Sequence, residues 1–126
     1  MSNKRVVFVL GCAAIVESLT PCAGSAQTPA TYMTGAQIQK EIVGKTFSSA
    51  TKRGIAYTMQ IGSGGTGLFT YSGKKSDPLT WELKGDVFCF HSSLSGTECN
   101  KVRPTNGKLD FVDSSTGVLN NTYTPQ

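Results

Sequence analysis

Apolar and polar residues alternate along most of the chain after Gly44. In the stretch Ile55–Ile61 every second residue is apolar, which is the pattern of a β-strand with one buried face. The same alternation returns in Leu79–Leu83 and Val87–His91. Short clusters rich in Gly, Ser, Asn and Asp interrupt it, and such clusters are typical of turns. The pattern predicts seven or eight strands, near Thr46–Ala50, Gly54–Ile61, Gly67–Tyr71, Leu79–Lys84, Val87–His91, Thr97–Arg103, Lys108–Val112 and Val118–Tyr123.

The short connections determine how these strands pair. A few residues can join only neighbouring strands that run in opposite directions, so we expect an antiparallel meander. A meander of this length with one apolar face must curl into a closed up-and-down barrel or a flattened sandwich, and closure removes the exposed edges that promote aggregation. We therefore predict a mostly β fold, a small lipocalin-like up-and-down barrel, with the sandwich as the alternative.

One short helix is predicted ahead of the strands. Apolar residues fall on one face of the stretch Gly35–Val43, Thr34 can cap its N-terminus, and Gly44 is placed to end it. The apolar face must be covered, so we expect the helix to plug one mouth of the barrel or to lie across a seam. Helix and strands together would form a single domain, residues 34–126.

The N-terminus has the features of a secretory signal peptide. Lys4 and Arg5 precede the apolar run Val6–Val16, and the small residues Ala23–Ala26 follow, as a signal peptidase requires near its cleavage site. The run is much shorter than the roughly 20 residues that a membrane-spanning helix needs. The sequence therefore predicts a signal peptide at residues 1–26 and no transmembrane segment.

This leader predicts a mature protein in the periplasm, or a secreted one, after cleavage near Ala26. Residues 27–33 would then form a disordered lead before the domain. Lipidation of Cys22 in place of cleavage after Ala26 stays open as an alternative.

The cysteines are informative once the leader is removed. Of the 4 cysteines, two would leave with the signal peptide, so Cys89 and Cys99 remain as the only pair. The turn between them is centred near Leu94, and residues placed symmetrically about a hairpin turn face each other across the two strands. An oxidising compartment favours their pairing. We predict a cross-strand disulfide.

The charge pattern favours no strongly charged partner. The chain has 12 Lys and Arg against 8 Asp and Glu, a formal net charge of +4, and loss of Lys4, Arg5 and Glu17 with the leader leaves +3. The basic residues are scattered and no aromatic residues interleave with them, which argues against nucleic acid as a partner. We expect a monomer whose partner is an envelope component or another protein.

No group of residues indicates catalysis or a cofactor. His91 is the only histidine, and Ser92 beside it would point to the opposite face of a strand. Gly62–Gly67 matches the dinucleotide-binding pattern G-x-G-x-x-G, but a strand and not a helix follows it. Cys89, His91 and Cys99 lack a fourth partner for a metal ion. We predict that the protein is not an enzyme and holds no metal and no cofactor.

Large apolar residues of the strands form the only candidate ligand site in the sequence. In a small barrel such side chains either line a cavity or fill the interior, and an eight-stranded barrel has about the width that side chains alone can fill. The residues that would line a cavity are Tyr57, Met59, Trp81, Phe88, Phe90 and Phe111.

Several short motifs are similar to a known group of proteins. Thr34–Ile38 opens the helix, Gly44–Thr46 enters the first strand, and Trp81–Cys89 is followed by Cys99–Val102. On these motifs the mature chain resembles a family of small exported alphaproteobacterial proteins whose function is unknown, although members usually have Gly where this chain has Leu79. The resemblance implies a periplasmic β-rich domain with one disulfide and supplies no catalytic residues.

Together these observations favour a non-enzymatic periplasmic binding or interaction domain, stabilised by one disulfide, whose ligand the sequence does not identify. Two alternatives remain open. The barrel could carry a small apolar ligand in its interior, or the protein could inhibit an envelope-directed enzyme such as lysozyme or a protease. A large cavity inside the barrel would favour a carrier, and a filled interior would favour recognition at the surface.

Overall fold

The computed structural model describes residues 31–72 and 75–126. The predicted signal peptide, its cleavage after Ala26 and the alternative of a lipidated Cys22 lie outside these residues. The described chain forms one helix followed by eight strands, which are α1 (Gly35–Glu41), β2 (Thr46–Ala50), β3 (Ala56–Ile61), β4 (Thr66–Tyr71), β5 (Lys75–Lys84), β6 (Val87–Ser92), β7 (Gly96–Thr105), β8 (Lys108–Asp113) and β9 (Leu119–Pro125).

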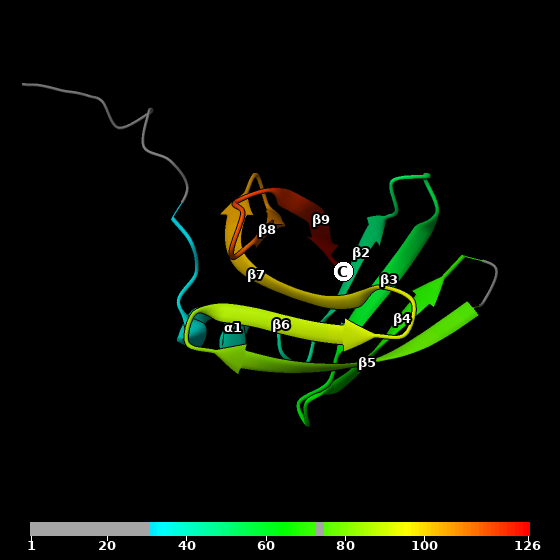
Figure 1. The fold of residues 1–126 in the computed structure, drawn as a ribbon, viewed down its shortest axis with the longest axis horizontal. Coiled ribbons are helices and arrows are strands. Elements are labelled where there is room, and N and C mark those ends of the chain that lie inside the picture. Colours follow the sequence, from blue (N-terminus) through cyan, green and yellow to red (C-terminus); the bar gives the residue numbers. More distant parts are fainter. Residues whose placement is uncertain (1–30, 73–74) are drawn as a thin grey trace, which may run out of the picture.

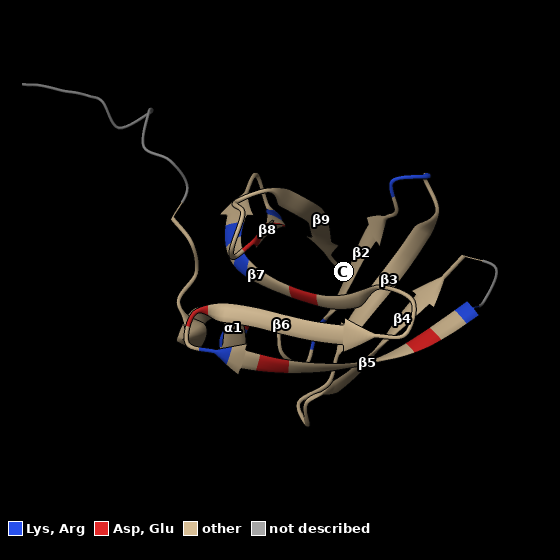
Figure 2. Ribbon diagram, in the orientation of Figure 1, with Lys and Arg blue, Asp and Glu red and all other residues tan. Residues whose placement is uncertain are grey.

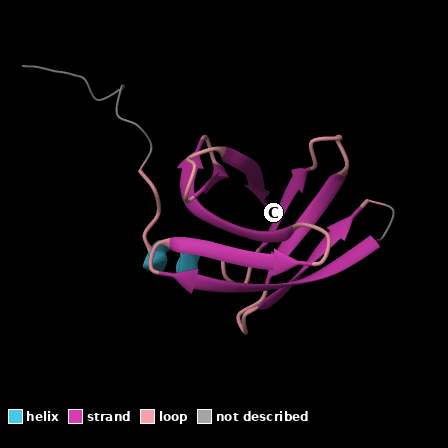
Figure 3. Cartoon of the chain, viewed as in Figure 1, coloured by secondary structure: helices cyan, strands magenta, loops and turns pink. Residues whose placement is uncertain are grey.

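The strands form a closed barrel (Figures 1 and 3). Each strand pairs antiparallel with the next one along the chain, and β9 returns to pair with β2. At this closing seam Phe47 faces Pro125, and Ser48 faces Thr124. The predicted meander and its closure into a small up-and-down barrel are therefore confirmed, and the sandwich is excluded.

The alternating strand directions place the turns at two opposite ends of the barrel. One end, called here the closed mouth, carries the β3–β4, β5–β6 and β7–β8 turns. The other end, called the open mouth, carries the β2–β3, β6–β7 and β8–β9 turns. This division decides which turns lie side by side at each end of the barrel.

The helix covers the closed mouth. Thr34 caps its N-terminus in a capping box, and the N–H of Gly35 donates a hydrogen bond of 2.6 Å to the carboxylate of Asp86 in the β5–β6 turn. Ile38 on its inner face and Ile42 at its C-cap have no solvent exposure. Of the two predicted placements, the helix therefore adopts the one at a mouth of the barrel.

The helix ends earlier than the sequence pattern predicts. It stops at Glu41 instead of Val43. The N–H of Gly44 donates to the carbonyl of Ile61 at 2.7 Å, so the chain must leave the helix to reach the end of β3. The left-handed conformation of Gly44 and its tertiary hydrogen bond therefore act together where the chain leaves the helix.

Strand β5 begins at Lys75, before the predicted start at Leu79. The reason is Asp77, which is only 2% exposed and accepts hydrogen bonds from the Ser93 hydroxyl at 2.8 Å and the Leu94 N–H at 3.1 Å. Burial by itself would raise the pKa of Asp77, but the hydrogen bonds outweigh it and lower the pKa. A carboxylate that breaks the apolar alternation thus ties the start of β5 to the β6–β7 turn.

Apolar side chains fill the barrel from the helix to about its middle. Met59, Phe88 and Phe111 have no exposed surface, and the rings of Phe88 and Phe111 meet edge to face with centroids 5.9 Å apart. Because the interior is packed at this level, the large internal cavity that would favour a carrier is not found among the described residues.

The end of the predicted lead is held against the barrel. The N–H of Met33 donates to the carbonyl of Val102 in β7 at 2.6 Å, and its side chain packs against the core. The ring of Tyr32 lies beneath Lys101 and Arg103, with the Lys101 Nζ 5.5 Å from the ring centroid. Residues 27–30 lie outside the described part of the chain.

The predicted disulfide is confirmed. Cys89 in β6 and Cys99 in β7 are directly opposed and are bonded to each other, with their Cα atoms 4.0 Å apart. Phe88 and Phe90 on either side of Cys89 point into the core, so the disulfide lies on the outer face of the barrel wall.

Replacing Cys89 with Ala should lower the free energy of unfolding. A crosslink between residues separated by 10 positions contributes about 2.5 to 3 kcal/mol by chain entropy, and less if the hairpin persists in the unfolded state. Denaturant unfolding of wild type and Cys89→Ala measures the loss, and reducing agent should abolish the difference. Thiol counting should find one free thiol, at Cys99, in the variant. Two free thiols in oxidised wild-type protein would contradict the pairing.

The glycine-rich stretch Gly62–Gly67 forms the turn from β3 into β4 and not a dinucleotide site, because a strand follows it as predicted. Gly67 has a steric role here. A β-carbon at this position would collide with the backbone oxygen of Gln60 and would lie 3.0 Å from Leu79. Gly64, in the same turn, has no neighbouring atom within 4 Å of such a carbon.

These two glycines form a matched pair for mutation. Gly67→Ala should destabilise the protein by about 1 to 3 kcal/mol because the backbone of β3 must shift, whereas Gly64→Ala should change stability by less than about 0.5 kcal/mol. Urea unfolding of the two variants measures both. Equal effects would show that the close approach of β3 and β4 at Gly67 does not constrain the fold.

Candidate functional site

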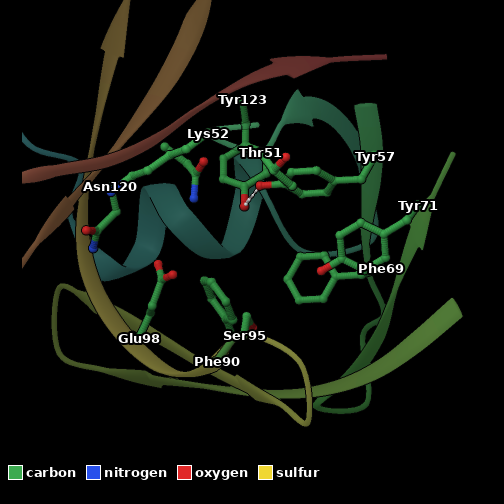
Figure 4. Close-up of a pocket in the computed structure, with 11 residues that line it drawn as sticks. Thr51, Lys52, Tyr57, Phe69, Tyr71, Phe90, Ser95, Glu98, Asn120 and Tyr123 are labelled. Carbon is green, nitrogen blue, oxygen red and sulfur yellow. Dashed lines mark hydrogen bonds between the residues drawn. The ribbon is translucent and has the colours of Figure 1, made fainter. Parts of the chain in front are cut away.

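The open mouth contains a pocket of about 230 Å³. Its rim comes from the β2–β3 turn, from the β6–β7 turn with the start of β7, and from the start of β9, while aromatic side chains form its walls and floor (Figure 4). It is slightly smaller than the roughly 300 to 1,000 Å³ of sites for drug-sized ligands. The lining residues are Thr51, Lys52, Tyr57, Phe69, Tyr71, Phe90, Ser95, Glu98, Asn120, Asn121 and Tyr123.

Two tyrosines join at one side of the pocket. The hydroxyl groups of Tyr57 and Tyr123 are 2.9 Å apart and share a buried hydrogen bond. Burial raises the pKa of both tyrosines, most strongly that of Tyr123, and the negative charge of Glu98 raises both further. The two phenols are therefore neutral at physiological pH and present a hydroxyl pair and ring surface to the pocket.

Glu98 brings a negative charge into this aromatic environment. Its carboxylate is directed from β7 into the pocket (Figure 4) and accepts a hydrogen bond from the side-chain amide of Asn100 at 3.2 Å. Asn100 has no solvent exposure, and its own carbonyl oxygen accepts a hydrogen bond from the Asn120 amide at 2.8 Å. A chain of two amides thus fixes the orientation of one half-buried carboxylate.

The open mouth also gathers exposed apolar side chains. Ile55 in the β2–β3 turn is 43% exposed, Leu94 in the β6–β7 turn 53%, and Val118 before β9 59%. Ile55, Leu94 and Tyr71 line a hollow of about 300 Å³, and Tyr71 also belongs to the pocket with Glu98. Exposed apolar groups concentrated around a pocket are typical of interaction surfaces.

Basic residues accompany these apolar groups. Lys52 and Arg53 lie in the β2–β3 turn and Lys75 lies at the start of β5 (Figure 2). All three side chains are exposed. The rim is therefore cationic and apolar, whereas the pocket inside it contains a carboxylate.

The structure brings only part of the predicted ligand-binding set into the pocket. Tyr57 and Phe90 line it. Met59, Phe88 and Phe111 lie in the packed core.

Trp81 lies towards the closed mouth, far from the pocket rim. Its indole N–H donates to the carbonyl of Gly62 in the β3–β4 turn at 2.8 Å. The tryptophan therefore holds a turn in place and does not line the pocket.

Sequence reasoning missed Tyr71, Glu98, Asn120 and Tyr123. A usable signal existed for Glu98, because it lies an even number of residues before Val102 and so shares the inward face of β7. The positions of Asn120 and Tyr123 depend on the pairing of β9 with both β8 and β2, which the sequence pattern does not specify.

His91 and its neighbours form no catalytic group in the structure. His91 is exposed on the outer face and its Nδ1 lies 2.8 Å from the Thr97 hydroxyl. Ser92 points inward, is 1% exposed and bonds to the hydroxyl of Ser95 at 2.6 Å. Histidine and serine are thus on opposite sides of the barrel wall, and within residues 31–72 and 75–126 no three His, Cys, Asp or Glu side chains are placed to hold a metal ion.

Fold and site together define the protein as a small closed up-and-down barrel with a polar and aromatic pocket at one mouth. No protein-family model, no curated protein and no solved structure matches the chain. The helix in the described part of the chain is too short to cross a membrane.

The tyrosine pair predicts an alkaline loss of stability. The pKa of Tyr123 in the folded protein is raised above its value of about 10 in the unfolded chain. The contribution of neutral Tyr123 to the free energy of unfolding is therefore complete below about pH 10, and it is lost as the pH rises towards the folded-state pKa. Denaturant unfolding between neutral pH and about pH 11 should show this fall, and Tyr123→Phe should reduce it. An identical fall in wild type and variant would assign it to other groups.

Proposed function

We propose that the protein is an exported, non-enzymatic binding domain that engages its ligand or partner through the open mouth of the barrel. The main supporting observation is that the pocket with Glu98, the hollow beside it and the exposed apolar residues of three separate turns all lie at this one end. The opposite end is covered by α1. These features favour the open mouth as the face that takes part in recognition.

Export is supported by two independent features. The first 26 residues have the signal-peptide pattern, and the bond between Cys89 and Cys99 is of a kind that persists in oxidising compartments. These features support a periplasmic or secreted location, and membership of the alphaproteobacterial family stays a prediction. The separation of His91 from Ser92 agrees with a function that does not involve catalysis.

Binding at the mouth has more support than carriage in the interior. Met59, Phe88 and Phe111, which would line the cavity of a carrier, belong to the packed core and have no exposed surface. An inhibitor of an envelope enzyme would be a special case of the proposed function, with the rim turns as its contact surface.

Substitution of the rim tests this function directly. Leu94→Ser and Ile55→Ser in one variant should weaken binding to components of an envelope extract about five- to tenfold, since each removes a large apolar side chain from the contact. Tyr32→Ser serves as the control, because Tyr32 is also an exposed large apolar residue but lies against β7. Quantitative binding of the extract to immobilised proteins provides the measurement, supported by native mass spectrometry of protein purified from its own host.

Two results would contradict the proposal. The first is equal binding by the rim variant and the wild type. The second is turnover of any substrate in a broad hydrolase panel that is lost on His91→Ala, since this would make the protein an enzyme.

A further inference from the structure

The pocket at the open mouth contains a negative charge that no neighbouring cation neutralises. In the described residues the ion pairs are Lys84 with Glu82 and Arg103 with Asp110, so no basic nitrogen there lies within 4.0 Å of the Glu98 carboxylate. Its only hydrogen-bond donor there is the neutral amide of Asn100. A half-buried carboxylate in this state favours a positively charged ligand, because attraction is stronger where water is partly excluded.

Five aromatic rings line the same pocket as this carboxylate (Figure 4). Tyr57 and Tyr71 have ring centroids 5.3 Å apart, Tyr57 and Tyr123 6.1 Å, and Phe69 and Phe90 5.6 Å, and all five rings line the pocket. The faces of such rings carry negative electrostatic potential and attract cations, above all methylated ammonium groups, which have few water molecules to lose. A pocket with aromatic walls and one carboxylate is therefore complementary to an organic ammonium ion.

The volume of the pocket limits the ligand. About 230 Å³ corresponds to the space of roughly eight water molecules in the liquid. This accommodates a trimethylammonium group with a short substituent, and it excludes a long acyl chain. A larger molecule could place only its ammonium end here.

Lys52 is the one basic residue that lines the pocket, and its charge opposes a cation. It lies in the exposed β2–β3 turn, where water and salt screen its charge. Glu98 is half-buried and held by the amide chain. The negative charge of Glu98, which is fixed and less solvated, therefore outweighs the positive charge of Lys52 inside the pocket.

We propose that the pocket at the open mouth binds an organic ammonium ion, with Glu98 as the counter-charge and the rings of Tyr57, Tyr71 and Phe90 as walls. This inference rests on the proposed function, because it assumes that the open mouth is the ligand-binding site. It adds the chemical class of the ligand.

The test compares choline with its uncharged isostere, the alcohol in which a tert-butyl group replaces the trimethylammonium group. Amide-resolved NMR titration of the full mature protein should show choline shifting signals of β7, β9 and the β2–β3 turn, and binding at least about fivefold more tightly than the isostere. Because the two ligands have nearly the same shape, the difference reports the charge.

Glu98→Gln should weaken choline binding about five- to tenfold and leave the isostere unchanged. Glu82→Gln is the matched control, because Glu82 faces Cys89 across the outer wall and pairs with Lys84 in solvent. Tyr71→Leu is a second test, because Tyr71 lies at the end of β4 and forms part of the aromatic wall. Its loss should weaken the binding of choline more than the binding of the isostere. The amide spectrum of each variant checks its folding.

Several outcomes would overturn the inference. These are equal affinity for choline and the isostere, unchanged choline binding in Glu98→Gln, and no binding of choline at all. A preference for inorganic phosphate that disappears in Lys52→Met would do the same, by showing that the mouth selects anions. If choline fails but the rim variant still loses its partner from the envelope extract, the ammonium inference is wrong and the proposed function stands.

Discussion

The pairing of β9 with β2 is the constraint on which the rest of the molecule depends. Once the two ends of the meander are hydrogen-bonded at Phe47 and Ser48, the circumference of the barrel is fixed and every second side chain must fit within it. Eight strands enclose about the space that side chains can fill. The aromatic residues of the closed half do fill it, and the space that remains is at the open mouth.

The two mouths differ because different elements end at each. At the closed mouth Ile38 of α1 and Ile42, which follows the helix as its C-cap, are fully buried, so that end has an apolar cover. At the open mouth no such cover exists among the described residues, and the inward positions of β7 and β9 are polar, with Glu98, Asn100 and Asn121. Polar groups inside a barrel are costly unless they are hydrogen-bonded. Asn100 is hydrogen-bonded to both Asn120 and Glu98. Glu98 accepts the hydrogen bond from Asn100 and is also partly exposed to solvent.

Function in such a molecule depends on the site and not on the fold, since small barrels support many unrelated activities. Here the site combines a neutral tyrosine pair, a fixed carboxylate and an apolar rim. None of these groups is a nucleophile placed beside a base, and the single histidine faces away from them. The arrangement supports the proposal of a ligand-binding site, and the charge and volume of the pocket are the basis for the proposed class of ligand.

Alternation of apolar and polar residues determined the strands and their antiparallel order, and the symmetry of the β6–β7 hairpin with the cysteine count determined the bond between Cys89 and Cys99. These features depend on local period and on hairpin symmetry, which neighbouring residues specify by themselves. The choice of a closed barrel over a sandwich came from the pairing of β9 with β2. The pocket depends on closure, which brings the start of β7 and the start of β9 to the same mouth as Tyr57. Tertiary contacts also moved the start of β5, where Asp77 bonds to the β6–β7 turn, and they assigned Trp81 to the β3–β4 turn. The period of a strand specifies which face a side chain occupies, but only the register of distant strands specifies which side chains meet.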